Sequence, residues 1–208
     1  MPRKAQHPNN SSSHSKPTPS KGGGQLRIIA GDWRGRKLPV ADLPGLRPTS
    51  DRIRETVFNW LNHYIPNAAV LDCFSGTGAL SFEALSRGAK SVTMLERATP
   101  AAQTLKNNLT TLKTSKADVI NTDSLQWLQK PASKAFDIIF LDPPFRMGLL
   151  EQTCQLLESN GYLHEKSLIY IEAEKELSPF PVPPNWQPLK SKTGGQVCFT
   201  LWSKKDTK

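Results

Sequence analysis

Short apolar runs alternate with segments of helical spacing along most of this chain, from about residue 68 to residue 202. The runs with the length and residue types of strands are 69–73, 91–95, 118–121, 136–141, 167–173 and 196–202, and a Pro-rich loop is expected over 179–188. The predicted helices between them are 79–87, 100–112, 124–129 and 148–158. Strands that alternate with helices form a mostly parallel sheet with both faces covered. We therefore predict an α/β fold with a mostly parallel sheet, in which 196–202 is a late antiparallel strand.

The composition divides the chain into a tail, an extension and a main domain. Residues 1–24 consist mainly of Ser, Pro, Asn, Gly and Lys, which cannot bury enough apolar surface to fold, so we expect a disordered basic tail. Residues 25–65 are predicted to form an N-terminal extension, and 66–203 the main domain. Residues 204–208 are a short second tail.

The extension is predicted to contain a β-hairpin and a helix. Two short apolar stretches flank a Gly-rich basic tip within 26–38, which is typical of a hairpin. A Pro-rich connector over 39–50 leads to a helix that Ser50 or Asp51 can cap and that runs to about His63.

The positive charge is concentrated near the N-terminus. The whole chain has a net charge of +9. Residues 1–54 contain 11 Lys and Arg against 3 acids, a balance of +8, and residues 55–208 contain 16 against 15, a balance of +1. This asymmetry indicates an arm that faces a polyanion, although residues 1–24 alone could equally serve solubility.

Composition also argues against several classes of protein. The longest apolar runs are a few residues, far short of the ~18–20 that cross a bilayer, and the N-terminus lacks the apolar region of a secretory signal. Cys73, Cys154 and Cys198 form an odd, widely spaced set, which argues against a disulfide framework and fits a reducing compartment. The histidines have no metal-ligand spacing. We expect a cytoplasmic protein without a metal or a membrane segment, and a monomer.

The residues that follow the strands are candidates for a binding site, because ligands of such sheets bind beyond the carboxyl ends of the strands. Gly76 and Gly78 follow the first strand and allow a tight turn before a helix. Glu96 follows the second strand and suits a carboxylate that binds the ribose hydroxyls of a nucleoside. Asp123 follows the third strand, where it either caps the next helix or accepts a hydrogen bond from an adenine amino group. A nicotinamide dinucleotide fingerprint would have a third glycine where this chain has Ser81.

The fourth strand is followed by Asp142-Pro143-Pro144-Phe145. Proline has no N–H and a fixed φ, so this turn is stiff and its carbonyl groups are free to accept hydrogen bonds. An acid, two prolines and an aromatic are poor packing material, and their position at a strand end beside the glycine turn predicts a functional site.

Together these strand-end motifs resemble the class I S-adenosylmethionine-dependent methyltransferases that act on exocyclic amines. This resemblance implies a Rossmann-like fold with a mostly parallel seven-stranded sheet and helices on both faces. A closer resemblance extends over about residues 25–203. The segments LRIIAGDWRGRKLPV, LRPTSDRIRETVFNWL, LDCFSGTGALSFEALSRGA and DPPFRMGLL are similar to those of the bacterial 16S ribosomal RNA guanine-N2 methyltransferases, the RsmD-like family. The resemblance implies S-adenosylmethionine as the cofactor. It implies 16S ribosomal RNA as the partner, either naked or within a small ribosomal subunit.

The resemblance also implies roles for individual residues. The expected catalytic residues are Asp142, Pro143 and Phe145. The expected cofactor-binding residues are Asp72, Phe74, Ser75, Gly76, Gly78, Glu96, Arg97, Asp123, Ser124, Thr49 and Arg52, the last two being alternatively a capped helix start with a solvated arginine. The expected RNA-binding residues are Trp33, Arg34, Arg36, Lys37 and Arg146. The alternatives are an exposed hairpin with Trp33 packed against the domain, and a solvated Arg146.

The chemistry of an exocyclic amine explains the choice of residues. The lone pair of such an amine is delocalised into the ring, and acceptors at Asp142 and Pro143 can direct it toward a methyl donor. Phe145 can stack on the base, or can be an ordinary core aromatic. Guanine-N2 methylation of 16S ribosomal RNA is the leading interpretation. Adenine-N6 or cytosine-N4 methylation of another RNA or of DNA, a nicotinamide-dependent oxidoreductase and a catalytically idle RNA-binding protein are the alternatives.

Overall fold

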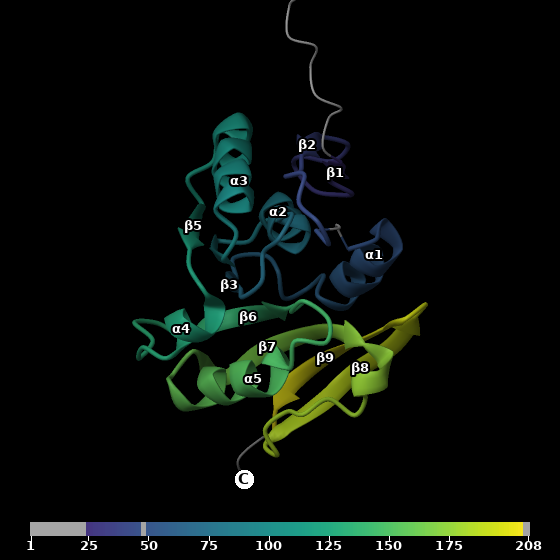
Figure 1. Ribbon diagram of the computed structural model, residues 1–208, viewed down its shortest axis with the longest axis vertical. Helices are drawn as coiled ribbons and strands as arrows, with labels where there is room; N and C mark the ends of the chain where they lie inside the picture. Colours follow the sequence, from purple (N-terminus) through teal and green to yellow (C-terminus); the bar gives the residue numbers. More distant parts are fainter. Residues whose placement is uncertain (1–23, 47–48, 206–208) are drawn as a thin grey trace, which may run out of the picture.

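The computed structural model describes residues 24–46 and 49–205. An N-terminal hairpin pairs β1 (Gln25–Arg27) antiparallel with β2 (Lys37–Pro39), as the sequence predicts. The main sheet is separate from it (Figure 1). The expected tail over residues 1–23 and the last residues, 206–208, lie outside the described part of the chain.

The main sheet has seven strands in the order β5-β4-β3-β6-β7-β9-β8. Its strands are β3 (Ala69–Asp72), β4 (Ser91–Glu96), β5 (Ala117–Asn121), β6 (Phe136–Leu141), β7 (Leu163–Glu174), β8 (Trp186–Gly194) and β9 (Val197–Lys204). The pairs from β5 to β7 are parallel, whereas β9 is antiparallel to both of its neighbours. The mostly parallel seven-stranded sheet and its late antiparallel strand are therefore confirmed.

Helices cover both faces of this sheet, also as predicted. The helices are α1 (Asp51–Trp60), α2 (Ala79–Ser86), α3 (Thr99–Leu112), α4 (Ser124–Leu128) and α5 (Leu149–Ser159), with a short 3-10 helix at Lys175–Leu177. Ser50 caps α1 by accepting a hydrogen bond from the backbone N–H of Ile53. This helix ends at Trp60 rather than near His63, because the chain turns there toward β3.

The expected loop over 179–188 is wrong at its C-terminal end, where β8 begins at Trp186. Only Trp186 of this strand is buried, because β8 is the edge of the sheet and carries polar residues. Pro188 is tolerated there next to a shift in the β8–β9 register. An edge strand without an apolar face has no alternation for sequence analysis to detect.

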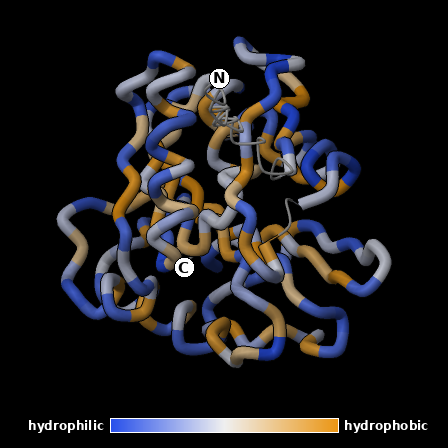
Figure 2. The backbone as a smooth tube through the Cα atoms, turned by 45° about the horizontal axis from the view of Figure 1, so that its top comes forward, coloured by the Kyte–Doolittle hydropathy of each residue, from blue (hydrophilic) through white to orange (hydrophobic). Residues whose placement is uncertain are grey.

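The core lies in two layers, one on each face of the sheet. Along β6, Ile138 and Phe140 pack with α1, α2 and α3, whereas Ile139 and Leu141 pack with α4 and α5. Side chains of a strand point alternately to its two faces, so the continuous apolar run of β6 serves both layers. Figure 2 shows hydrophobic segments along the interior and hydrophilic residues on the outer loops. In the two described ranges, no helix is both long and apolar enough to cross a bilayer.

The carboxylate of Glu83 on α2 attaches the N-terminal extension to the main domain. It is fully buried, and it accepts hydrogen bonds from the backbone N–H groups of Ile29 at 2.9 Å and Ala30 at 3.0 Å. Arg54 of α1 lies 3.5 Å from it and Arg87 lies 2.7 Å from it. A single buried charge thus joins the hairpin, α1 and α2.

The tip of the hairpin is fixed at the last residue of α2. The backbone N–H of Asp32 donates to the carbonyl of Ser86 at 2.8 Å, and that of Trp33 donates to its hydroxyl at 2.9 Å. A Cβ added at Gly31 would lie 1.9 Å from the Ser86 carbonyl oxygen, so only glycine allows this close approach. The tip therefore lies at the end of α2 opposite to the glycine turn that precedes this helix.

We predict that Glu83→Gln lowers the free energy of unfolding by about 3 kcal/mol, because it leaves the buried Arg54 guanidinium without its buried anion. Urea denaturation measures the change, and Glu55→Gln on the exposed face of α1 is the matched control. A loss within about 0.5 kcal/mol of the control's would contradict this role for Glu83.

Candidate active site

The chain reverses its direction of strand addition next to β3. It passes from β3 to β4 and β5 on one side and then returns to place β6 on the other. In the parallel register Asp72 lies beside Met94 on β4 and beside Phe140 on β6. Glu96 and Asp142 therefore both lie two residues beyond this level, on opposite sides of β3. With strands about 4.8 Å apart, they face one another across about 10 Å of the same edge.

Glu96 is bonded to the glycine turn that follows β3. One carboxylate oxygen accepts from the backbone N–H of Gly76 at 2.8 Å, and the other accepts from that of Ala98 at 2.7 Å. The side chain is half-buried, and each oxygen retains a lone pair for a further donor. The predicted neighbours Glu96 and Gly76 are thus brought together.

The two glycines of the turn have different reasons to be glycine. Gly78 has φ +78°, and an added Cβ would lie 2.4 Å from the ring of Phe82 and 2.6 Å from Leu105. This residue is therefore required by the packing of α2. Gly76 has φ +50°, and an added Cβ would lie 3.2 Å from Leu46. The connector before α1 thus crosses directly over the turn.

Asp72 is buried beneath the turn. Its carboxylate accepts a hydrogen bond from the Ser81 hydroxyl at 2.6 Å, so the residue in place of a third fingerprint glycine serves this acid. Burial is the main cause that raises the pKa of Asp72 to about 7, and the negative charge of Glu96 acts in the same direction.

Asp142 ends β6 on the other side of the turn. Its Oδ2 lies 3.5 Å from the hydroxyl of Thr49, at the long limit for a hydrogen bond. Burial, followed by the charges of Glu172 and Asp72, raises the pKa of Asp142 well above its ordinary value, while the Thr49 hydroxyl lowers it. Thr49 was expected beside the cofactor, and the structure places its hydroxyl against the catalytic candidate.

The rest of the turn after β6 presents apolar side chains to the outside. Pro143 is buried, whereas Phe145 is 44% exposed and Met147 is 54% exposed. Arg146 is exposed with φ 61°, and its backbone N–H donates to Glu174 at 2.9 Å. An exposed aromatic beside a half-buried acid is suited to stacking, and the core-packing alternative for Phe145 does not match this exposure.

The other expected cofactor residues lie around the same edge. Asp123 caps α4 by accepting from the backbone N–H of Gln126 at 3.1 Å, which is the structural role that the sequence left open. Ser124 is buried and donates to the carbonyl of Cys73, and Ser75 donates its backbone N–H to Leu95. Phe74 is half-buried against the second core layer, and Arg97 and Arg52 are exposed.

The expected RNA-binding residues of the hairpin do not all have the same environment. Arg34, Arg36 and Lys37 are exposed, whereas Trp33 is half-buried and packs against the core. This packing matches the alternative interpretation of Trp33, and its contact with RNA stays a prediction.

Two residues near the site were not identified from the sequence. Arg54 is 1% exposed, and its Nε donates to the carbonyl of Thr49 at 3.2 Å. Glu172 of β7 is 5% exposed and accepts from the Tyr170 hydroxyl at 2.7 Å. The available signal for Glu172 was an acid inside the apolar run of β7, and Arg54 had no signal apart from its place near the apolar stripe of α1.

The edge of the sheet is acidic. In the described ranges, the carboxylates of Asp72, Glu96, Asp142 and Glu172 form no salt bridge with a lysine or arginine. The same ranges contain no group of His, Cys, Asp and Glu arranged to hold a metal ion, and the three cysteines are buried and free. The site therefore suits a ligand that brings positive charge and hydrogen-bond donors.

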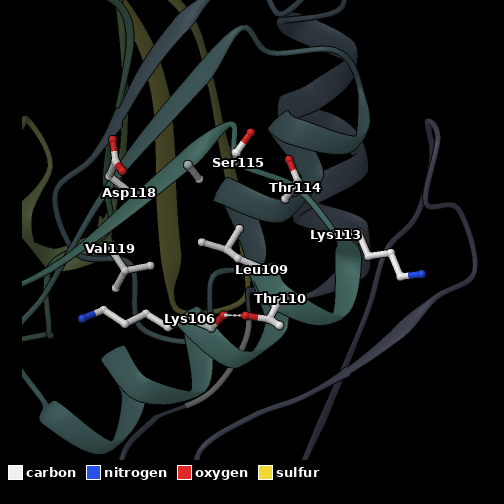
Figure 3. Close-up of a pocket in the computed structure, with 9 residues that line it drawn as sticks. Lys106, Leu109, Thr110, Lys113, Thr114, Ser115, Asp118 and Val119 are labelled. Atoms are coloured by element: carbon white, nitrogen blue, oxygen red, sulfur yellow. Dashed lines mark hydrogen bonds between the residues drawn. The ribbon is translucent and has the colours of Figure 1, made fainter.

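A cavity of about 600 Å³ lies elsewhere, between the C-terminal half of α3 and the start of β5 (Figure 3). Lys106, Lys113 and Asp118 are among its lining residues. Because it opens at the amino end of β5, it is not part of the edge that carries Asp142.

Comparison with known proteins identifies the family. A family model described as "Conserved hypothetical protein 95" matches residues 26–203. The ribosomal RNA small subunit methyltransferase D of Escherichia coli (strain K12) is 51% identical over 88% of this chain and 92% of its own length. That of Haemophilus influenzae is 53% identical over 86% of this chain and 94% of its own length. The chain belongs to the RsmD family of methyltransferases.

Solved structures agree with this membership. The yhhF protein of Escherichia coli has a TM-score of 0.82 and 48% identity, covering 88% of this chain and 99% of that one. The HI0767 protein of Haemophilus influenzae has a TM-score of 0.77 and 48% identity, covering 88% of this chain and all of that one (100%). The Rossmann-like methyltransferase fold of this RsmD-family chain is thereby confirmed.

We predict that Asp72→Asn flattens the pH dependence of stability. The folded protein holds a proton on Asp72 up to about pH 7, whereas the unfolded chain releases it near the ordinary pKa of an aspartate. This group therefore contributes stability that is present at low pH and is lost as pH rises from about 4 through 7, with an upper limit of about 4 kcal/mol. Urea denaturation at pH 5, 6, 7 and 8 measures the difference between variant and parent, with the exposed Asp118→Asn as control. Parallel curves for Asp72→Asn and the parent would refute it.

Proposed function

We propose that this protein transfers a methyl group from S-adenosylmethionine to the exocyclic N2 amine of a guanine in 16S ribosomal RNA. The observation that carries the proposal is the position of Asp142-Pro143-Pro144-Phe145, at the same sheet edge as the Gly76 turn and Glu96. The names of the relatives support ribosomal RNA of the small subunit as the substrate class.

The charge of the site supports the choice of cofactor. S-adenosylmethionine has an ammonium group, a sulfonium centre and ribose hydroxyls, all of which suit an edge lined by carboxylates. Glu96 would hold the ribose hydroxyls, and Asp72 would hold the ammonium group once ionised. A nicotinamide dinucleotide brings a negatively charged pyrophosphate, which the acids of this edge would repel wherever they are ionised. Together with Ser81 in place of a third glycine, this repulsion argues against the oxidoreductase alternative.

The turn after β6 supplies what an amine needs in order to react. When bound, the cofactor provides an electrophilic methyl group. The carboxylate of Asp142 and the backbone carbonyl of Pro143 would each accept a hydrogen bond from one N–H of the amine. The lone pair of the nitrogen would then point away from these acceptors, toward the methyl group. Phe145 stacks on the base and holds the amine in line. Asp142 then takes the proton that the methylated nitrogen releases.

Recognition of RNA would take place partly at a distance from this chemistry. The basic hairpin tip contacts Ser86, at the far end of α2 from Gly78, and α2 is about 12 Å long. Arg34, Arg36 and Lys37 would bind phosphates there, while the target base is unstacked to reach Asp142.

The choice of guanine needs its own test, because the Asp-Pro-Pro-Phe motif can accept the exocyclic amine of guanine, adenine or cytosine. Mass mapping of modified nucleosides in ribosomal RNA from cells that lack this protein tests it. Loss of one N2-methylguanosine is the expected result. Loss of an N6-methyladenine or N4-methylcytosine would instead favour the alternative base.

We predict that Asp142→Ala lowers the rate of methyl transfer at least 100-fold, because it removes an acceptor that acts on the reacting amine. The dissociation constant for S-adenosylmethionine, measured by calorimetry, is expected to stay within about threefold, because the cofactor is held on the β3 and β4 side. Asp118→Ala is the matched control. Equal losses of binding and transfer in folded Asp142→Ala would contradict the catalytic role.

We predict that replacing Arg34, Arg36 and Lys37 with glutamine weakens RNA binding and lowers the slope of log affinity against log salt by about 2. The matched control replaces the exposed lysines Lys166, Lys190 and Lys192, which changes the net charge equally. If both sets of variants had the same slope of log affinity against log salt, the assignment of RNA binding to the hairpin would be wrong.

A further inference from the structure

Glu172 is a buried acid that the mechanism above does not use. It lies on β7, 5% exposed, and its Oε2 accepts from Tyr170. Among the hydrogen bonds of the described residues, Tyr170 is the one donor to this carboxylate. A buried carboxylate without a cation is costly to keep.

The register of the strands places Glu172 next to Asp142. On adjacent parallel strands, Phe140 pairs with Tyr170 and Leu141 pairs with Ile171. The next positions along the two strands are Asp142 and Glu172, with strands about 4.8 Å apart. Phe140 and Tyr170 point to the face covered by α1, and alternation directs Asp142 and Glu172 to this face as well.

We propose that Glu172 is a positioning residue for the transfer, sharing one proton with Asp142 across the β6–β7 pair while the hydroxyl of Thr49 holds the other side of Asp142. This inference rests on the proposed methyl transfer. Two adjacent carboxylates with one proton carry a single negative charge, which suits an amine on one side and a sulfonium on the other. When the methylated nitrogen releases its proton, the pair takes it up and becomes neutral, and the proton leaves to solvent with the product.

The groups around the pair act on it in opposite senses. Asp72 on β3 and Glu172 on β7 raise the pKa of Asp142 after burial, and Thr49 lowers it. Burial raises the pKa of Glu172 as well, and the Tyr170 hydroxyl lowers it. On β9, the residue opposite Glu172 is the uncharged Phe199. Replacing Glu172 and replacing Thr49 should therefore move the ionisation of Asp142 in opposite directions.

The first experiment measures the pH profile of kcat for methyl transfer to 16S ribosomal RNA. Glu172→Gln keeps an acceptor for the Tyr170 hydroxyl and removes the charge. The acidic side of the pH profile should therefore shift by about one unit toward lower pH, which is about a tenfold higher relative rate at the low-pH end. Thr49→Val removes the hydroxyl and should move the limb up, and Thr49→Ser should restore it. Glu165→Gln on the exposed start of β7 is the control.

The second experiment needs neither RNA nor activity. The carboxyl carbons of protein labelled with 13C on aspartate are titrated by NMR, and Asp142 is identified by the signal lost in Asp142→Asn. The Asp142 midpoint should fall in Glu172→Gln and rise in Thr49→Val. An unchanged midpoint in folded Glu172→Gln would overturn the inference, whatever the enzyme methylates. A shifted midpoint in a protein that methylates no RNA amine would count against the proposed function alone.

Discussion

The buried carboxylate of Glu83 holds together the parts of the molecule that meet at the site. It binds two backbone N–H groups of the hairpin and the guanidinium of Arg54, and Arg54 in turn binds the carbonyl of Thr49. The hydroxyl of Thr49 reaches Asp142. The connector that begins after the hairpin also lays Leu46 over Gly76. An extension that precedes the first strand of the main sheet therefore contacts both sides of the site, and the buried carboxylate of Glu83 fixes its position.

The acidic residues at the carboxyl edge of the sheet lower the stability of the free protein. Carboxylates that are buried without cations ionise less readily and oppose folding as pH rises. Under the proposed function, the sulfonium and ammonium groups of S-adenosylmethionine would offset this repulsion on binding, so the charge that destabilises the free protein would favour the complex. Stability and binding are thereby linked through the same side chains, which is a common arrangement at functional sites.

Much of the site was predictable because each of its motifs follows a strand. Gly76, Glu96 and Asp142 were placed on one edge from the alternation alone, and their strand pairing confirms it. The same reasoning could not distinguish cap from ligand at Asp123, where the structure shows the cap. It could not identify the partner of Thr49 either, since 93 residues separate it from Asp142. It missed β8, whose polar edge position leaves no periodic pattern.

The sequence by itself determined the succession of strands and helices apart from β8, the class of the sheet and the chemical type of its strand ends, because periodicity and turn residues act locally. Only the tertiary structure decided which side chains became neighbours. Glu83 and Arg54, Asp142 and Thr49, and Glu172 beside Asp142 all come from segments far apart in the chain. Their protonation depends on burial and on charges brought close by folding, and neither quantity exists in the unfolded sequence.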